Sequence, residues 1–202
     1  MERAGARRTD DPLNCYALQA FLISTGVVAL AEIGDKTQLL ALLLATRFRK
    51  PVPIVLGILV ATVANHAFAG AVGTWLTTQI GPATLRWILG VSFVAMGVWA
   101  LIPDKDPDQT EQAPRFGVFV TTVVAFFLVE MGDKTQIATV ALAARFDSLI
   151  PVVIGTTLGM MIANVPAVLL GDAATKRLPL RLIRGIAAAL FVTLGAYVLL
   201  LG

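Results

Sequence analysis

The chain alternates between long apolar stretches without charge and short clusters of charged residues, a pattern typical of helical membrane proteins. A helix needs about 20 residues to cross the roughly 30 Å hydrocarbon core of a bilayer. The pattern predicts helices at about 16–46, 52–78, 85–102, 116–146, 152–170 and 183–201. The alternating ten-residue segments of a membrane β-barrel are absent from the sequence. The predicted fold class is therefore an all-α integral membrane protein with six transmembrane helices.

Two of these stretches, 16–46 and 116–146, carry a charged motif near their middle. The motif reads E-I-G-D-K-T at 32–37 and E-M-G-D-K-T at 130–135, and a glutamine follows each copy. Each Asp, Lys or Arg at the centre of a membrane helix costs about 2.5–3.5 kcal/mol on insertion scales. Three ionisable groups within five residues, twice, indicate a functional polar site at membrane depth. A helix over 16–46 is also too long for the bilayer, so it must tilt strongly or break near Gly34.

The second half of the chain repeats the first at an offset of 98 residues. The residues of the two motifs coincide at this offset. Further identical residues outside the motifs are Arg47-Phe48 with Arg145-Phe146, Arg86 with Arg184, Phe93 with Phe191 and, with a one-residue shift, Asn65 with Asn164. The repeats are predicted at 1–102 and 116–202, joined by an acidic, proline-containing linker at 103–115. Three helices in each repeat would insert the second copy upside down, which is the architecture of secondary transporters with a site at the repeat interface.

The residue types of the motif favour binding of a hard cation. On a continuous helix, Glu32, Asp35 and Lys36 would share one face, as would their counterparts 98 residues later. Carboxylate and amide oxygens suit Ca²⁺, Mn²⁺ or Mg²⁺. The predicted metal ligands are Glu32, Asp35, Glu130, Asp133, Asn65 and Asn164. The predicted supporting and proton-coupling residues are Gly34, Lys36, Thr37, Gln38, Gly132, Lys134, Thr135 and Gln136.

The charge of such a pocket suggests how cation and proton movement could be coupled. Four carboxylates and two lysines sum to −2, which one divalent cation would neutralise. Carboxylates buried close together take up protons when no cation balances them. Glu32 and Glu130 would then bind either the cation or protons, never both.

Structural readings of the same residues stay open. Each Glu–Lys pair could be an intrahelical ion pair that only holds the two halves together. Lys36 and Lys134 are better explained as counter-ions than as ligands. Asn65 and Asn164 could complete the coordination shell, or they could join membrane helices by hydrogen bonds.

Composition narrows the class of protein further. Of 202 residues, 57% are hydrophobic and 14% are charged, and the net charge is +3. A single cysteine, Cys15, excludes an internal disulfide framework and a thiolate metal cluster. No Ser/His/Asp or Cys/His constellation and no phosphate-binding loop is visible, so the chain is not expected to be an enzyme. Nine loop lysines and arginines lie on one predicted side of the membrane and five on the other. Because cytoplasmic loops carry more Lys and Arg, this favours both termini outside and the 103–115 linker in the cytoplasm.

At the two motifs the sequence resembles the Golgi-type manganese/calcium–proton exchanger family, whose members carry two E-x-G-D-K-(S/T) motifs in two three-helix repeats. The resemblance covers nearly the whole chain, and Glu32 to Thr37 and Glu130 to Thr135 match without substitution. It implies antiport of Mn²⁺ and Ca²⁺ against protons, with manganese export in bacterial members. The long amino-terminal extension of the eukaryotic organellar members is absent, which favours a compact bacterial-type protein of the plasma membrane.

The sequence thus predicts a secondary transporter that exchanges Mn²⁺, or Ca²⁺, for protons by alternating access. The cations are cargo, and no permanently bound cofactor and no nucleic-acid partner is expected. A proton-coupled exporter of organic cations or amino acids, a passive cation channel and a non-transport assembly protein are the alternatives.

Overall fold

A computed structural model describes residues 12–102, 117–170 and 180–201 of the chain. These residues form eight helices and no strand. The helices are α1 (Pro12–Glu32), α2 (Lys36–Phe48), α3 (Pro51–Gln79), α4 (Pro82–Ala100), α5 (Gly117–Glu130), α6 (Lys134–Phe146), α7 (Leu149–Leu170) and α9 (Leu180–Leu201). The predicted linker at 103–115 lies outside the described residues.

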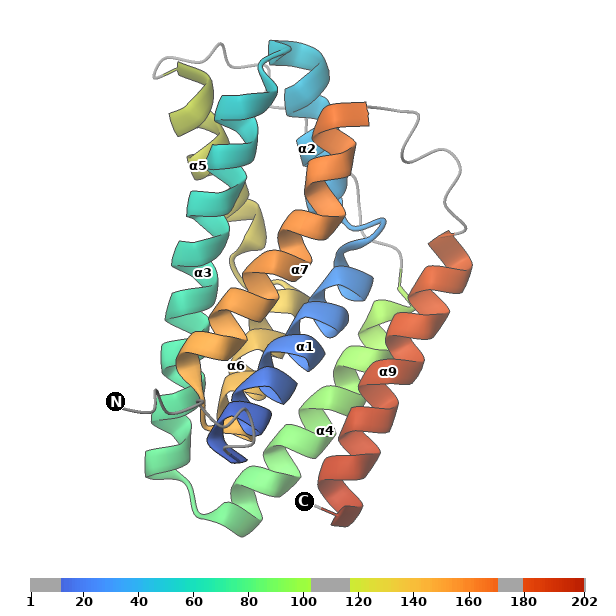
Figure 1. Cartoon of the computed structure of the whole chain (residues 1–202). Coiled ribbons are helices and arrows are strands. Elements are labelled where there is room, and N and C mark those ends of the chain that lie inside the picture. Colours follow the sequence, from blue (N-terminus) through green and yellow to red (C-terminus); the bar gives the residue numbers. More distant parts are fainter. Residues whose placement is uncertain (1–11, 103–116, 171–179, 202) are drawn as a thin grey trace, which may run out of the picture.

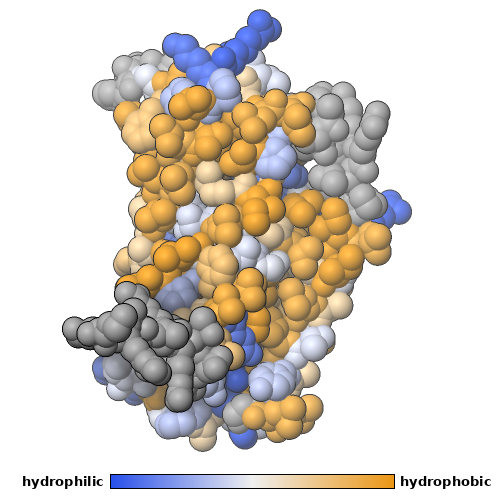
Figure 2. All heavy atoms as spheres, viewed as in Figure 1, coloured by the Kyte–Doolittle hydropathy of each residue, from blue (hydrophilic) through white to orange (hydrophobic). Residues whose placement is uncertain are grey.

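Five of the helices, α1, α3, α4, α7 and α9, are long and apolar enough to cross a membrane, and α5 is a shorter apolar helix. Large apolar side chains cover much of the side of the molecule, as the orange surface in Figure 2 shows. Side chains such as Leu56, Phe68 and Leu200 are exposed, because lipid rather than water is their solvent. The membrane class predicted from the sequence is confirmed, and four of the six predicted helices agree with observed ones within three residues at each end.

Each of the two motif-bearing stretches is divided into two helices by a break at its motif. Gly34 and Gly132 adopt positive φ angles of 81° and 74°, a left-handed conformation that glycine adopts without steric cost. Asp35 and Asp133 follow in extended conformation as the N-cap residues of α2 and α6. Of the two options that the sequence left for the 16–46 stretch, a strong tilt or a break near Gly34, the structure has the break, and the 116–146 stretch is broken in the same way at Gly132. The single helical face for Glu32, Asp35 and Lys36 is wrong for the same reason.

The corresponding helices of the two halves run in opposite directions (Figure 1). In this view α1 rises to its break and continues upward as α2, whereas α5 descends and continues downward as α6. The same reversal relates α3 to α7 and α4 to α9, and α1 begins at the end of the molecule where α9 ends.

One close helix packing is also repeated between the halves. A Cβ added at Gly57 of α3 would lie 3.0 Å from the carbonyl oxygen of Phe119 in α5. A Cβ at Gly155 of α7 would lie 2.5 Å from the carbonyl oxygen of Phe21 in α1. Gly155 stands 98 residues after Gly57, and Phe21 stands 98 residues before Phe119. The corresponding glycine of each repeat therefore lets the corresponding two backbones approach.

Gly155→Ala is expected to lower the thermal stability of the detergent-solubilised protein. The new methyl group would meet backbone atoms of Phe21, which cannot turn aside, so α1 and α7 would have to separate at a cost of about 1–3 kcal/mol. Gly26→Ala is the matched control on α1, because a Cβ there meets nothing within 4 Å. Equal melting temperatures for the two variants would contradict the close packing of α1 on α7.

Candidate cation site

The two helix breaks bring both motifs together in the interior. Glu32, Asp35, Glu130 and Asp133 are each at most 1% exposed. Four carboxyl groups buried this deeply are costly in a membrane protein unless counter-ions and hydrogen bonds compensate them. The surroundings of these carboxyl groups therefore decide what the cluster can bind.

Two ion pairs cross between the halves. Lys36 Nζ lies 3.2 Å from Asp133 Oδ1, and Lys134 Nζ lies 2.5 Å from Asp35 Oδ1. Each lysine therefore pairs with the aspartate of the other motif. These crossed pairs agree with lysines that act as counter-ions.

The two glutamates are held in matching ways by threonines of their own motifs. Thr37 Oγ1 donates a hydrogen bond to Glu32 Oε2, and Thr135 Oγ1 donates one to Glu130 Oε1. The second carboxylate oxygens, Glu32 Oε1 and Glu130 Oε2, are buried and accept no hydrogen bond from the described residues. Each glutamate thus keeps one oxygen for another partner.

Three of the four carboxyl groups, those of Glu32, Asp35 and Asp133, have oxygens close enough together to share one cation, and Glu130 is not in this group. Glu32, Asp35 and Asp133 can each offer a carboxylate oxygen within 4.8 Å of the others. Oxygen ligands 2.0–2.6 Å from a central Mn²⁺, Mg²⁺ or Ca²⁺ ion are separated by roughly such distances. The chemistry of the donor set fits a hard divalent cation.

The glutamines of the motifs stabilise the breaks. Gln38 Oε1 accepts a hydrogen bond from the Gly34 backbone N–H at 2.9 Å, and Gln136 Oε1 accepts one from Gly132 at 2.7 Å. Gln38 Nε2 also donates to the carbonyl oxygen of Ala163 at 2.8 Å, which joins α2 to α7. Their amide oxygens satisfy backbone groups that the breaks would otherwise leave unpaired.

Asn65 and Asn164 are buried on α3 and α7 but are bonded differently. Asn65 Nδ2 donates to the carbonyl oxygen of Phe127 in α5 at 3.2 Å. Asn164 Nδ2 donates within its own helix to the carbonyl oxygen of Met160 at 3.1 Å. The Oδ1 atoms of both asparagines are buried and accept no hydrogen bond from the described residues. Both amide oxygens therefore remain candidates for coordination.

Asn164→Ala is expected to raise the KM for the transported cation about 2–10-fold, as the loss of one neutral oxygen ligand would. Asn65→Ala should do the same and also lower the melting temperature, because it removes the bond that joins α3 to α5. Transport rates over a range of cation concentrations, with melting curves of both variants, measure the two effects separately. An unchanged KM for Asn65→Ala would assign that residue to packing alone.

One residue beside the cluster, Arg184, was not among the predicted site residues. Arg184 Nη2, from the first turns of α9, lies 3.5 Å from the carbonyl oxygen of Gly34. The pattern that could have identified it is its match with Arg86 in the first half, at the repeat offset of 98.

The comparison with protein families gives a match over most of the chain. Residues 20–108 and 118–202 match the family described as "Divalent cation/proton antiporter GDT1". The chain belongs to this family. The GDT1 family is one of transporters, so the expected resemblance is confirmed and the assignment as a cation/proton antiporter is shown.

Individual relatives agree with the family match. A Vibrio cholerae protein named "Putative manganese exporter" is 51% identical over 178 residues, covering 88% of each chain. A GDT1-like protein of Synechocystis is 31% identical over 193 residues, covering 86% of this chain and 93% of its own. Arabidopsis thaliana GDT1-like protein 5 is 25% identical and covers 91% of this chain. No solved structure gives a significant match.

Proposed function

We propose that this GDT1-family antiporter exports Mn²⁺ from the cytoplasm in exchange for protons, and that Ca²⁺ is a second cation that it transports. The observation that carries the proposal is the cluster of four buried carboxyl groups and two lysines at the helix breaks. The name of the Vibrio cholerae relative supports manganese as the cargo and export as the direction. The oxygen-rich donor set, with only one histidine and one cysteine in the chain, favours hard cations over zinc or copper.

The proposed ligands are Glu32, Glu130, Asp35 and Asp133, with Asn65 and Asn164 completing the shell. The two crossed ion pairs balance two of the four carboxylates and leave a net charge of −2 on the cluster. A divalent cation neutralises this charge when it is bound. When the cation leaves, protons on Glu32 and Glu130 replace it, because an uncompensated −2 in a low-dielectric interior is unfavourable. Competition for the same two carboxylates couples the two fluxes.

We further propose that the chain forms six membrane crossings as two inverted repeats, 1–102 and 116–202, with each broken helix pair acting as one crossing. The opposite directions of the corresponding helices support this arrangement. So does the repeated packing of Gly57 on Phe119 and of Gly155 on Phe21. An inverted repeat with its polar site at the interface of the halves is suited to alternating access.

The proposed location is the plasma membrane of a bacterial-type cell, with both termini outside. Cys15, the single cysteine, is exposed in the first turns of α1 and reports this orientation directly. A membrane-impermeant maleimide should label it in intact cells. Labelling only after the membrane is permeabilised would reverse the orientation.

The experiment that tests the function uses purified protein in liposomes that contain a pH-sensitive dye. Mn²⁺, Ca²⁺, Mg²⁺ and an organic cation are added separately, and Mn²⁺ is expected to drive the largest proton movement. Proton movement with the organic cation alone would overturn the metal assignment. Cation uptake that is independent of a pH gradient and moves no protons would indicate a channel.

A further inference from the structure

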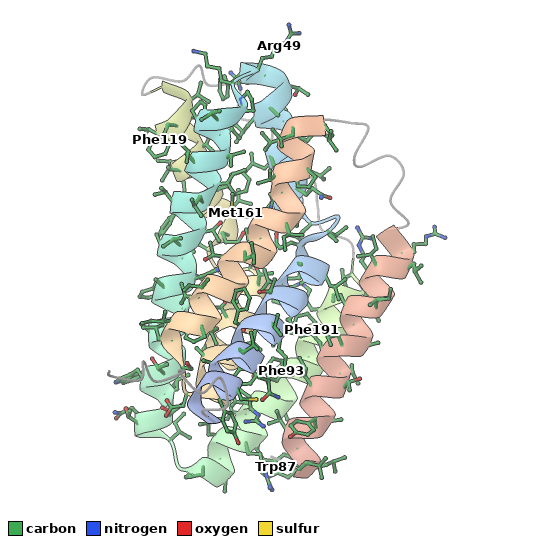
Figure 3. The ribbon with its side chains drawn as sticks, in the orientation of Figure 1. Arg49, Trp87, Phe93, Phe119, Met161 and Phe191 are labelled. Carbon is green, nitrogen blue, oxygen red and sulfur yellow. The ribbon has the colours of Figure 1, made fainter. Side chains whose placement is uncertain are left out.

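Helices α4 and α9 form a pair that is symmetric within itself. Phe93 and Phe191, which are 98 residues apart, stack with their ring centres 6.5 Å apart, and Figure 3 labels both between the neighbouring helices. Gly97 faces Val192, and Gly195 faces Val94, which is the same contact seen from the other repeat. The pair therefore behaves as one unit with its own two-fold relation.

This unit lies asymmetrically against the remainder of the protein. It packs on α1 and α6, and in the described part of the chain it makes no comparable contact with α2 or α5. Figure 1 shows α9 beginning at the level of the α1–α2 break and extending away from α2. In the repeat, α1 corresponds to α5 and α6 corresponds to α2. The equivalent position of the α4/α9 unit in the other half is therefore against α5 and α2, where it could pack through the same surfaces.

The two sides of the carboxylate cluster differ accordingly. Lys134 is 4% exposed beside Asp35, whereas Lys36 is 25% exposed beside Asp133. Gly132 is exposed, while Gly34 is partly covered. The cavity at Gly34 has a volume of only about 10 Å³, about the space for one water molecule, and is lined by Asp35, Lys134 and Arg184 among others. The Gly34 side is closed, and the Gly132 side is the more open.

Arg86 and Arg184 correspond to each other in the repeat, but only Arg184 lies at a helix break. Arg184 stands at the closed break, 3.5 Å from the Gly34 carbonyl oxygen. Arg86, its counterpart on α4, lines a separate cavity of about 320 Å³ with Ala144 and Arg145. Ala144 is ten residues along α6 from Lys134, or about 15 Å, so Arg86 lies far from the Gly132 break.

We propose that Arg184 and Arg86 are alternating gate residues of the antiporter, each closing one side of the cation site. In the present state Arg184 holds the Gly34 break shut. In the opposite state the α4/α9 unit shifts toward α5 and α2, Arg184 leaves Gly34, and Arg86 takes the equivalent position at the Gly132 carbonyl. The proposal rests on the proposed function, because it assigns these residues to the access steps of that exchange.

The chemistry of arginine suits this role. The guanidinium group is positively charged, so it repels a divalent cation from the closed side of the site. Its N–H groups can bind a carbonyl oxygen that the helix break has released from α-helical bonding. Neither arginine needs to touch the cation, so both are positioning residues.

The test uses two reporter cysteines, introduced one at a time into Cys15→Ala protein. Ile33→Cys lies at the Gly34 break and Met131→Cys at the Gly132 break, in matched positions of the repeat. Their rates of modification by a charged methanethiosulfonate reagent are measured in detergent and in liposomes. Arg184→Gln should raise the rate at position 33 roughly tenfold and lower it at 131, and Arg86→Gln should do the reverse, because each loses one charged contact of a single state.

Arg181→Gln is the control, since Arg181 is exposed on the same helix and should change neither rate. Arg184→Lys keeps the charge but loses the planar fork, and should give a smaller change in the same direction if the glutamine variant does not fold. Rates that change together at both positions, or not at all, would overturn the gate assignment. Mn²⁺-driven proton movement in the Cys15→Ala parent is measured in parallel, so absence of exchange there counts against the proposed function and not against the gate.

Discussion

Glu32→Gln and Glu130→Gln are each expected to abolish Mn²⁺-driven proton movement while the protein stays folded in the membrane. Glutamine has the same shape as glutamate, and its amide oxygen can still accept the hydrogen bond from Thr37 or Thr135. The substitution therefore removes a charge and a proton-binding group without creating a cavity. Because the variant no longer buries this charge, its free energy of unfolding should be unchanged or slightly higher.

The size of the loss follows from the two roles of each glutamate. Removing even an outer-sphere partner of a metal ligand typically costs 10–100-fold in affinity or activity, so losing a ligand that is also the proton carrier should cost more than about 100-fold. Initial rates in liposomes and Mn²⁺ binding by calorimetry give the two contributions separately. Thr37→Val is the control, because it removes the hydrogen-bond donor but keeps the Glu32 carboxylate. Retained exchange in either glutamine variant would remove that glutamate from the site.

Lys134→Met is expected to cause the largest loss of stability among substitutions at the cluster. It leaves the Asp35 carboxylate buried without the lysine that lies 2.5 Å away, and removal of one partner of a buried ion pair costs about 3–5 kcal/mol. Lys36→Met should cost less, because Lys36 is 25% exposed and its environment screens the Asp133 charge better. Melting temperatures in detergent, measured for both variants, test the difference.

Asp35→Asn combined with Lys134→Met should recover most of that lost stability, since it removes both charges of the pair together. Recovery of stability without recovery of transport would assign the ion pair to the folding of the site and Asp35 to cation binding. A double variant no more stable than Lys134→Met alone would show that Lys134 stabilises the protein through contacts other than Asp35.

The sequence alone was sufficient for the class of protein and for the inventory of chemical groups. A bilayer tolerates only backbone that is satisfied internally, so apolar length by itself identified α3, α4, α7 and α9 within a few residues. The cost of charge in hydrocarbon singled out Glu32, Asp35 and their counterparts, and the internal repeat indicated that the two motifs belong to one site. Each of these inferences depends on local composition or on identity at a fixed offset.

Tertiary structure decided how those groups are paired and which side of the cluster is closed. The sequence left open whether a motif stretch tilts or breaks. In the structure the left-handed glycines, whose N–H groups donate to Gln38 and Gln136, turn each chain so that its lysine reaches the aspartate of the other half. The position of Arg184 at Gly34 depends on where the α4/α9 unit packs. The repeated sequence offers that unit two equivalent surfaces, so only the three-dimensional arrangement shows which of them it packs on.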